Sequence, residues 1–174
     1  MVQKIFFYGI ASIMLLINNS CSKEEFPFNA SGLTYKGKLV YNNQFKMNGI
    51  YIADIDGNIG VNYYFLDGTY YHVSIDTYEQ GNECVQINER DIPYYWGYFL
   101  IEGDTLKVQT FDPTSKQRYH EFRVEERWAI IENDSTIRFF KKLTPEKNEL
   151  RLNETFHNTQ CKNKPDSTNI LMKD

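Results

Sequence analysis

Short runs of alternating apolar and polar residues, separated by turn dipeptides, recur along most of this chain. Because successive side chains of a strand point to opposite faces, a period of two predicts half-buried β-strands. Asp-Gly between two such runs predicts a tight hairpin, because a type I′ turn needs positive φ at both central residues. The turn signals are Asp56-Gly57, Asp67-Gly68, Gly103-Asp104 and Asn133-Asp134. This pattern favours an antiparallel meander over any helical fold.

The alternation also sets the expected bounds of the strands. It predicts strands over residues 33–41, 49–54, 58–66, 69–76, 96–102, 105–111, 118–132, 135–142 and 150–156. Residues 77–93 are polar and predict a long loop, and residues 144–149 predict one helical turn. An open sheet of this kind would expose the unpaired backbone groups of its edge strands, and closure into a barrel leaves no exposed edge. We therefore predict an all-β fold: a single small antiparallel up-and-down β-barrel of about eight strands.

The two faces of a strand can also be assigned from their chemistry. In 105–111, Leu106 and Val108 are expected to point inward. In 118–132, Trp128 shares a face with other apolar residues, whereas Glu125 and its alternate neighbours are charged and predict a solvated face. In 69–76, His72 is expected on the outer face.

A cluster of rings offers the sharpest candidate binding surface. Alternation sends Tyr94, Trp96 and Tyr98 to one side of their strand. If that side is exposed, the rings could stack on a sugar or enter a pocket of a partner, because Tyr and Trp give large contact area at low entropic cost. The alternative, which we favour, is that both sides are covered, one by the barrel core and the other by residues 77–93.

The amino-terminal residues have the layout of a secretory signal. Lys4 precedes an apolar run of thirteen residues, 5–17. A membrane-spanning helix needs about 20 apolar residues, so a permanent transmembrane helix is the weaker interpretation. Ser20 then precedes Cys21, which predicts cleavage after residue 20 and lipidation of Cys21, although Asn18 stands where such boxes usually have Leu. The alternative is an ordinary signal with an incidental cysteine.

Net charge and cysteine content limit the partners. Residues 21–174 carry 18 basic and 23 acidic side chains, because Lys4 is the only charged residue before them, so their net charge is 18 − 23 = −5. An acidic chain without a basic cluster is a poor candidate for nucleic acid. Outside the inner membrane disulfides are permitted, so Cys84 and Cys161 predict one bridge, with two free thiols as the alternative.

No catalytic or metal-binding constellation is visible in the sequence. The three histidines, His72, His120 and His157, lie far apart without metal-ligand spacing. No Gly-x-Ser-x-Gly elbow or phosphate loop is present. Residues 54–60 superficially match the start of a calcium loop but lack its Gly and its bidentate Glu, so an Asp-Gly hairpin explains them better. We expect no enzyme activity, no cofactor and no metal.

Two resemblances follow from these residues. The meander over 33–142, with Gly49-Ile50-Tyr51 in the place of an early Gly-x-Trp, resembles the lipocalin-like (calycin) barrels. The chain also resembles small uncharacterised lipoproteins of the Bacteroidota, through Trp96-Gly97-Tyr98-Phe99, Gly103-Asp104, Asn133-Asp134 and the run 164–169. The second resemblance implies an outer-membrane lipoprotein, and the acidic run 21–25 resembles a surface-export signal. The alternative is that residues 21–25 are only a charged, flexible tether, which is expected beside any anchor.

The expected organisation is a signal over 1–20, a lipidated flexible tether over 21–32, a β-barrel domain over 33–160 and a polar tail over 161–174. Two functions remain open. The first is a lipid-anchored envelope barrel that binds a small molecule, such as a carbohydrate, or an envelope protein. The second is a structural accessory subunit of an outer-membrane complex with a filled barrel. A core filled by Phe65, Trp128 and Phe139 would favour the second function, because ligand binding needs a pocket of roughly 300 Å³.

Overall fold

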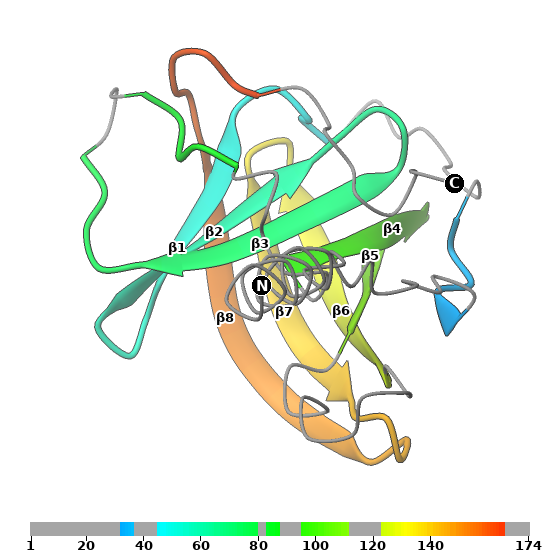
Figure 1. The fold of residues 1–174 in the computed structure, drawn as a ribbon. Helices are drawn as coiled ribbons and strands as arrows, with labels where there is room; N and C mark the ends of the chain where they lie inside the picture. The colour runs from blue at the N-terminus through cyan, green and yellow to red at the C-terminus, as the bar shows by residue number, and fades with distance from the viewer. Residues whose placement is uncertain (1–31, 37–44, 80–82, 88–94, 112–122, 166–174) are drawn as a thin grey trace, which may run out of the picture.

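The computed structural model describes residues 32–36, 45–79, 83–87, 95–111 and 123–165, and these form a closed antiparallel barrel (Figure 1). Each strand pairs with the next in sequence, and β8 returns to pair with β1. The all-β, eight-stranded, up-and-down prediction is therefore confirmed. The strands are β1 (Ile50–Ile55), β2 (Asn58–Tyr64), β3 (Thr69–Ile75), β4 (Trp96–Glu102), β5 (Thr105–Phe111), β6 (Val124–Asn133), β7 (Thr136–Leu143) and β8 (Glu149–Thr159).

The hairpins follow from local backbone chemistry. Asp56 and Gly57 both have positive φ, 54° and 85°, as the Asp-Gly signal predicts. Gly103 alone has positive φ in its two-residue turn, which fits a type II′ turn. The turn before β3 differs from the prediction: only Gly68 has positive φ, and Phe65 N–H bonds to the Thr69 carbonyl across a three-residue loop. A glycine at the end of such a loop supplies the left-handed residue that it needs.

Three predicted elements need correction. Residues 34–36, predicted as part of a first strand, form a turn, and 37–41 lie outside the described residues. The helical turn predicted over 144–149 is a hairpin turn in which Thr144 and Asn148 bond to each other through their backbones. The last strand is longer than predicted, since β8 pairs with both β7 and β1. Of the long strand predicted over 118–132, the structure describes the part from 124 as β6.

The barrel interior holds one of two hydrophobic cores. Its members come from all eight strands, which places them inside the closed sheet, and Leu106 and Val108 are among them, as predicted. The interior core consists of Phe45, Tyr51, Ala53, Tyr64, Tyr70, Phe99, Ile101, Leu106, Val108, Ala129, Ile131, Ile137, Phe139 and Phe156. Of the three side chains whose presence in the core would favour the second function, only Phe139 lies in this core. Phe65 belongs to the other core, and Trp128 lies half-buried outside.

A second core lies on the outer face of β1 to β5. Residues 83–87 and the segment around Leu33 cover this face, and Trp96 and Tyr98 are buried in it at 2% and 0% exposure. Cys84 is joined to Cys161 by a disulfide, and Cys84 N–H bonds to the Lys162 carbonyl at 2.8 Å. These contacts attach the residues after β8 to the outer wall of the barrel.

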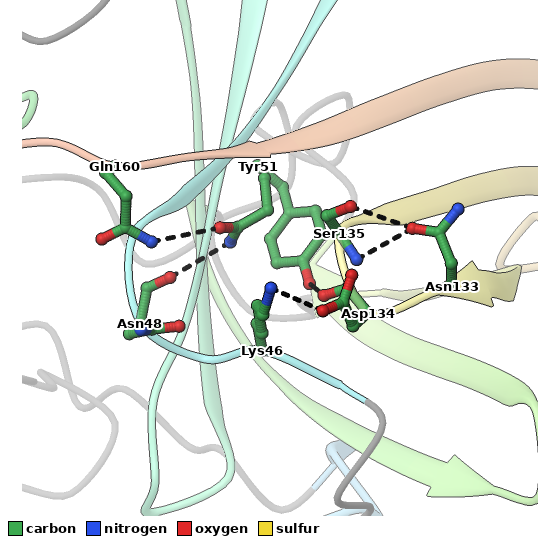
Figure 2. Close-up of polar contacts among 8 residues, drawn as sticks. Lys46, Asn48, Tyr51, Asn133, Asp134, Ser135 and Gln160 are labelled. Carbon is green, nitrogen blue, oxygen red and sulfur yellow. Dashed lines mark hydrogen bonds and ion pairs between the residues drawn. The ribbon is translucent and has the colours of Figure 1, made fainter.

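One end of the barrel is covered by residues 45–49, just before β1. Phe45 stacks on Tyr51 with ring centroids 5.2 Å apart. Figure 2 shows Lys46 bound to Asp134 of the β6–β7 turn, with a separation of 2.5 Å between Nζ and Oδ2. From the other side, Lys164 donates hydrogen bonds to the carbonyls of Met47 and Tyr64. We call this the covered end.

We expect Gly97→Ala to destabilise the barrel, because β4 approaches β5 too closely there for a side chain. An added Cβ would lie 2.0 Å from the carbonyl oxygen of Gln109, which belongs to a paired strand and cannot move freely. Overpacking of this kind costs about 1–3 kcal/mol of unfolding free energy. Urea unfolding should show this loss, whereas Ser74→Ala at an exposed position of β3 should change stability by less than about 0.5 kcal/mol. Equal stability of the two variants would contradict the close approach.

Candidate functional site

Beyond the apolar core, the inward faces of the strands become polar. Four polar residues each lie two positions from an interior-core residue on the same strand: Asn62 from Tyr64, His72 from Tyr70, Arg127 from Ala129 and Glu154 from Phe156. Because a strand returns to the same face every second residue, these four side chains also point into the barrel. Lys142 lies opposite Arg127 in the β6–β7 register and so shares its face. We call this set the interior polar cluster: Asn62, Tyr64, Tyr70, His72, Glu125, Arg127, Lys142 and Glu154.

Alternation predicted the wrong face for Glu125, Trp128 and His72. Glu125 was expected on a solvated face of its strand, but it is 8% exposed. Trp128 was grouped with inward apolar residues, but its ring lies outside between the ammonium groups of Lys107 and Lys141, each 4.4 Å from its centroid. A large ring can remain half-exposed when cations cover its faces, so the apolar face of β6 did not have to be the inner one. His72, expected outside, alternates with Tyr71 and shares the inner face with Tyr70.

Two ion pairs cross the cluster. The Arg127 guanidinium binds the Glu154 carboxylate, and their side chains are 13% and 22% exposed. Arg127 also lies over the Phe139 ring, 4.6 Å from its centroid. Lys142 Nζ lies 2.6 Å from Glu125 Oε2, and the side chain of Glu125 is 10% exposed. The strands therefore hold two positive and two negative side chains inside the barrel.

Asn62 is fully buried and its orientation is fixed by its neighbours. Its Oδ1 accepts a hydrogen bond from the Tyr70 hydroxyl at 2.8 Å and lies 2.6 Å from His72 Nδ1. When His72 carries its proton on Nδ1, both acceptor positions of the oxygen are occupied. The Asn62 side chain also lies close enough to the Tyr64 hydroxyl to lower the pKa of that group. Among the described residues, three buried polar atoms of the cluster find no hydrogen-bond partner of good geometry: Asn62 Nδ2, Tyr64 Oη and Arg127 Nε.

Burial keeps the imidazole and the two phenols of the cluster neutral. Burial, and then the positive charge of Arg127, lowers the pKa of His72 to about 4. Burial raises the pKa of Tyr64 well above its usual value, and the neighbouring Tyr70 raises it further. The pKa of Tyr70 is also raised, mainly by burial. At neutral pH the cluster therefore presents a neutral imidazole and protonated phenols beside the paired charges.

We expect this burial of His72 to make stability depend on pH. The folded protein keeps the ring neutral to about pH 4, whereas the unfolded chain binds a proton below about pH 6.5, so stability is lost as the pH falls through this window. At about 1.4 kcal/mol for each unit of pKa shift, and allowing for partial exposure, the loss should be about 2–3 kcal/mol. Urea unfolding of the native protein and His72→Gln at pH 7 and pH 4.5 isolates this contribution, since the other groups are common to both. Equal losses would contradict it.

The predicted ring surface is not what the structure shows. Trp96 and Tyr98 are buried beneath residues 83–87, so they offer no exposed stacking surface, and the favoured alternative of a covered strand holds for both. Tyr94 and the predicted lipidation site Cys21 lie outside the described residues. Cys84 and Cys161 are paired, as the bridge interpretation expected.

A groove of about 470 Å³ lies on the outer wall, where β1 and β8 separate after their three paired positions. Its lining includes Ile52, Tyr78 and His157. The Tyr78 hydroxyl is buried there and has no hydrogen-bond partner within the described ranges. With one such atom and no charged pair, this groove is a weaker candidate than the interior polar cluster.

The fold and the cluster define a closed antiparallel barrel with a charged interior. No family model matches the sequence, and no curated protein and no solved structure gives a significant match. Within the described ranges, no three His, Cys, Asp or Glu side chains are grouped to hold a metal ion. The same residues include no helix long and apolar enough to cross a membrane.

Proposed function

We propose that this chain is a non-enzymatic, lipid-anchored lipoprotein of the bacterial outer membrane whose barrel binds a small ligand inside the interior polar cluster. One observation carries the proposal: three buried polar atoms there, Asn62 Nδ2, Tyr64 Oη and Arg127 Nε, lack hydrogen-bond partners in the part of the chain that the structure describes. Each such atom costs about 1–3 kcal/mol of stability when it stays unpaired. The strands that carry these atoms are paired along both edges and hold them in place despite this cost. A ligand that formed hydrogen bonds with the atoms would remove the cost.

The rigidity of the cluster supports binding. Its members stand on strands, which position side chains more accurately than loops do. The Arg127–Glu154 pair and the Asn62 contacts fix the donors before any ligand arrives, which lowers the ordering cost of binding. Lys142, at 30% side-chain exposure, marks the side from which solvent reaches the cluster.

The packed half of the interior favours a second function, a structural accessory subunit without a ligand. Tyr64, Phe99 and Phe139 are at most 1% exposed, and Phe45 packs on Tyr64 and Phe99 at the covered end. A barrel stabilised in this way could serve as a passive scaffold on an envelope complex. Its polar cluster would then hold water, and a search for a bound compound would separate the two functions.

We expect the protein purified from its own membranes in mild detergent to carry a non-covalent compound, detected by native mass spectrometry. Arg127→Lys keeps the charge facing Glu154 but removes the Nε–H donor, so the affinity should fall by about tenfold, the effect of losing one hydrogen bond to a charged group, and the bound fraction should fall with it. Arg138→Lys, in the more exposed pair with Glu132, is the matched control and should leave the fraction unchanged. A native mass equal to that of the lipidated polypeptide alone would support the scaffold function.

The anchor is proposed from Cys21, since the disulfide accounts for the other two cysteines of the chain. We expect Cys21→Ser to move the protein from the membrane pellet to the soluble fraction, because acyl chains contribute about 0.8 kcal/mol for each buried methylene. Cys84→Ser should remain in the pellet. Immunoblots of the two fractions measure this, and retention of Cys21→Ser in the membrane would refute the anchor.

A further inference from the structure

We infer that two copies of this chain pair with each other along the first half of β8 and so form a dimer. This inference concerns the outside of the barrel and does not depend on the proposed ligand. It follows from three observations on residues 149–155: backbone groups that no strand faces, an arginine beside a like charge, and side chains that match a second copy of the same edge.

The first half of β8 is paired on one side only. β1 pairs with β8 at residues 157–159 and then separates from it, whereas β7 pairs with β8 as far as its first residue (Figure 1). Asn148 and Asn158 both bond to the β7 side through their backbones, so even-numbered residues face β7 and odd-numbered ones face away. Within the described residues, no strand faces the backbone N–H and C=O groups of Glu149, Arg151, Asn153 and Thr155.

An arginine on this edge lies beside a like charge. Arg151 is directly opposite Lys141 in the β7–β8 register, and like charges directly opposite each other destabilise a sheet. Among the described residues, Arg151 has no carboxylate within ion-pair distance. Glu149 instead binds Lys141, with 3.0 Å between Oε2 and Nζ. A carboxylate from another molecule would relieve the repulsion at Arg151.

A second copy of the same edge supplies that carboxylate. Pairing across a two-fold axis is self-complementary, so its register is fixed by the residue that meets itself. With Leu150 opposite Leu150 of the second copy, Glu149 of each chain lies opposite Arg151 of the other. The odd-numbered residues then face each other, as their free backbone groups require. Leu150, which is 48% exposed, gains an apolar neighbour.

Other registers match less well. Pairing centred on Arg151 places two guanidinium groups opposite each other. Pairing centred on Leu152 or Asn153 leaves Arg151 opposite an uncharged residue and extends the contact to Thr155, which lines the groove between β8 and β1. Pairing centred on Leu150 uses only the end of β8 that is farthest from β1, where the residues are exposed.

A cysteine on the two-fold axis tests the dimer. Leu150 takes a non-hydrogen-bonded position, where paired Cα atoms are about 4.5 Å apart, which is within reach of a disulfide. Full-length Leu150→Cys, oxidised in its own membranes with copper-phenanthroline, should give a dimer band on a non-reducing gel. Leu66→Cys, at the other exposed large apolar residue of the described ranges, is the matched control and should stay monomeric. No dimer band, or equal bands from both variants, would overturn the inference.

Charge reversal tests the register. Glu149→Arg places two guanidinium groups opposite each other and Arg151→Glu two carboxylates, so each should weaken dimerisation at least about tenfold. The double variant restores opposite charges and should regain the native affinity within about threefold. Asp76→Arg, which reverses an exposed acid after β3, is the control and should dimerise normally.

Sedimentation velocity of the full protein in mild detergent measures these affinities. At about 100 μM, a dimer with a micromolar dissociation constant is mostly assembled. A native protein that is monomeric at this concentration would overturn the inference. Native affinity in either single variant, or no recovery in the double variant, would also overturn it, because the paired charges would then not face each other.

Discussion

Arg127→Met is expected to lower the free energy of unfolding by about 3–5 kcal/mol, because it leaves the Glu154 carboxylate inside the barrel without its partner. Removing one member of a buried ion pair is far more costly than removing a surface charge. The loss should be measured by urea unfolding of the purified protein at pH 7, followed by tryptophan fluorescence.

Two controls separate this loss from a general effect of removing arginine. Arg138→Met breaks a pair whose side chains are 40% and 35% exposed, so it should cost less than about 1 kcal/mol. Arg127→Met combined with Glu154→Leu replaces the whole pair with apolar groups and should recover most of the stability. If Arg127→Met costs no more than Arg138→Met, the pair is solvated and the interior site does not exist as described.

The same double variant bears on function. A barrel that regains its stability with Met and Leu in place of the ion pair does not need these charges in order to fold. If that protein has also lost its bound compound, the charges serve binding. If it binds as before, the interior polar cluster is a structural feature.

Loss of the disulfide is the second large effect. Replacing Cys84 and Cys161 with Ser should lower the free energy of unfolding by about 4 kcal/mol, because the bridge joins residues 77 apart and so restricts the unfolded chain. The bridge also secures two covers: residues 83–87 over Trp96, and Lys164 against the carbonyls at the covered end. Burial lowers the pKa of Lys164 to about 8, because the ammonium group loses part of its hydration at the covered end.

The measurement compares urea midpoints with and without a reducing agent. The native protein should lose stability on reduction, and the Cys84→Ser, Cys161→Ser double variant should be insensitive to it. A native protein whose midpoint does not move on reduction would show that the bridge does not stabilise the fold.

Much of the fold was predictable because it depends on neighbouring residues. The bounds of β2 to β5 follow closely from alternation, and the Asp56-Gly57 turn has the two positive φ values that its sequence requires. The segment 33–36 was mistaken for a strand although Thr34 and Tyr35 instead donate their backbone N–H groups to the side chain of Gln109. Gln109 is more than 70 residues away in the sequence, so no local pattern predicts this contact.

The candidate site was missed for the same kind of reason. Alternation separates two faces of β6 but does not say which face is inside, so the charges of Glu125 and Arg127 were read as a solvated surface. Their burial is tolerated because Lys142 and Glu154 come from other strands to pair with them. A sequence signal does exist, since each charge has an opposite charge on a later strand, but it becomes specific only when the register is known.

The sequence by itself determined the strands, the hairpin turns and the two cysteines available for a bridge, because backbone conformation and alternation are local properties. Only the tertiary structure decided which faces point inward, since this depends on how the sheet closes and on which segments cover its outer wall. Closure buried Asn62, His72 and Arg127 and brought their partners together across the barrel. The charged interior therefore arises from pairing between distant strands, which no single stretch of the chain encodes.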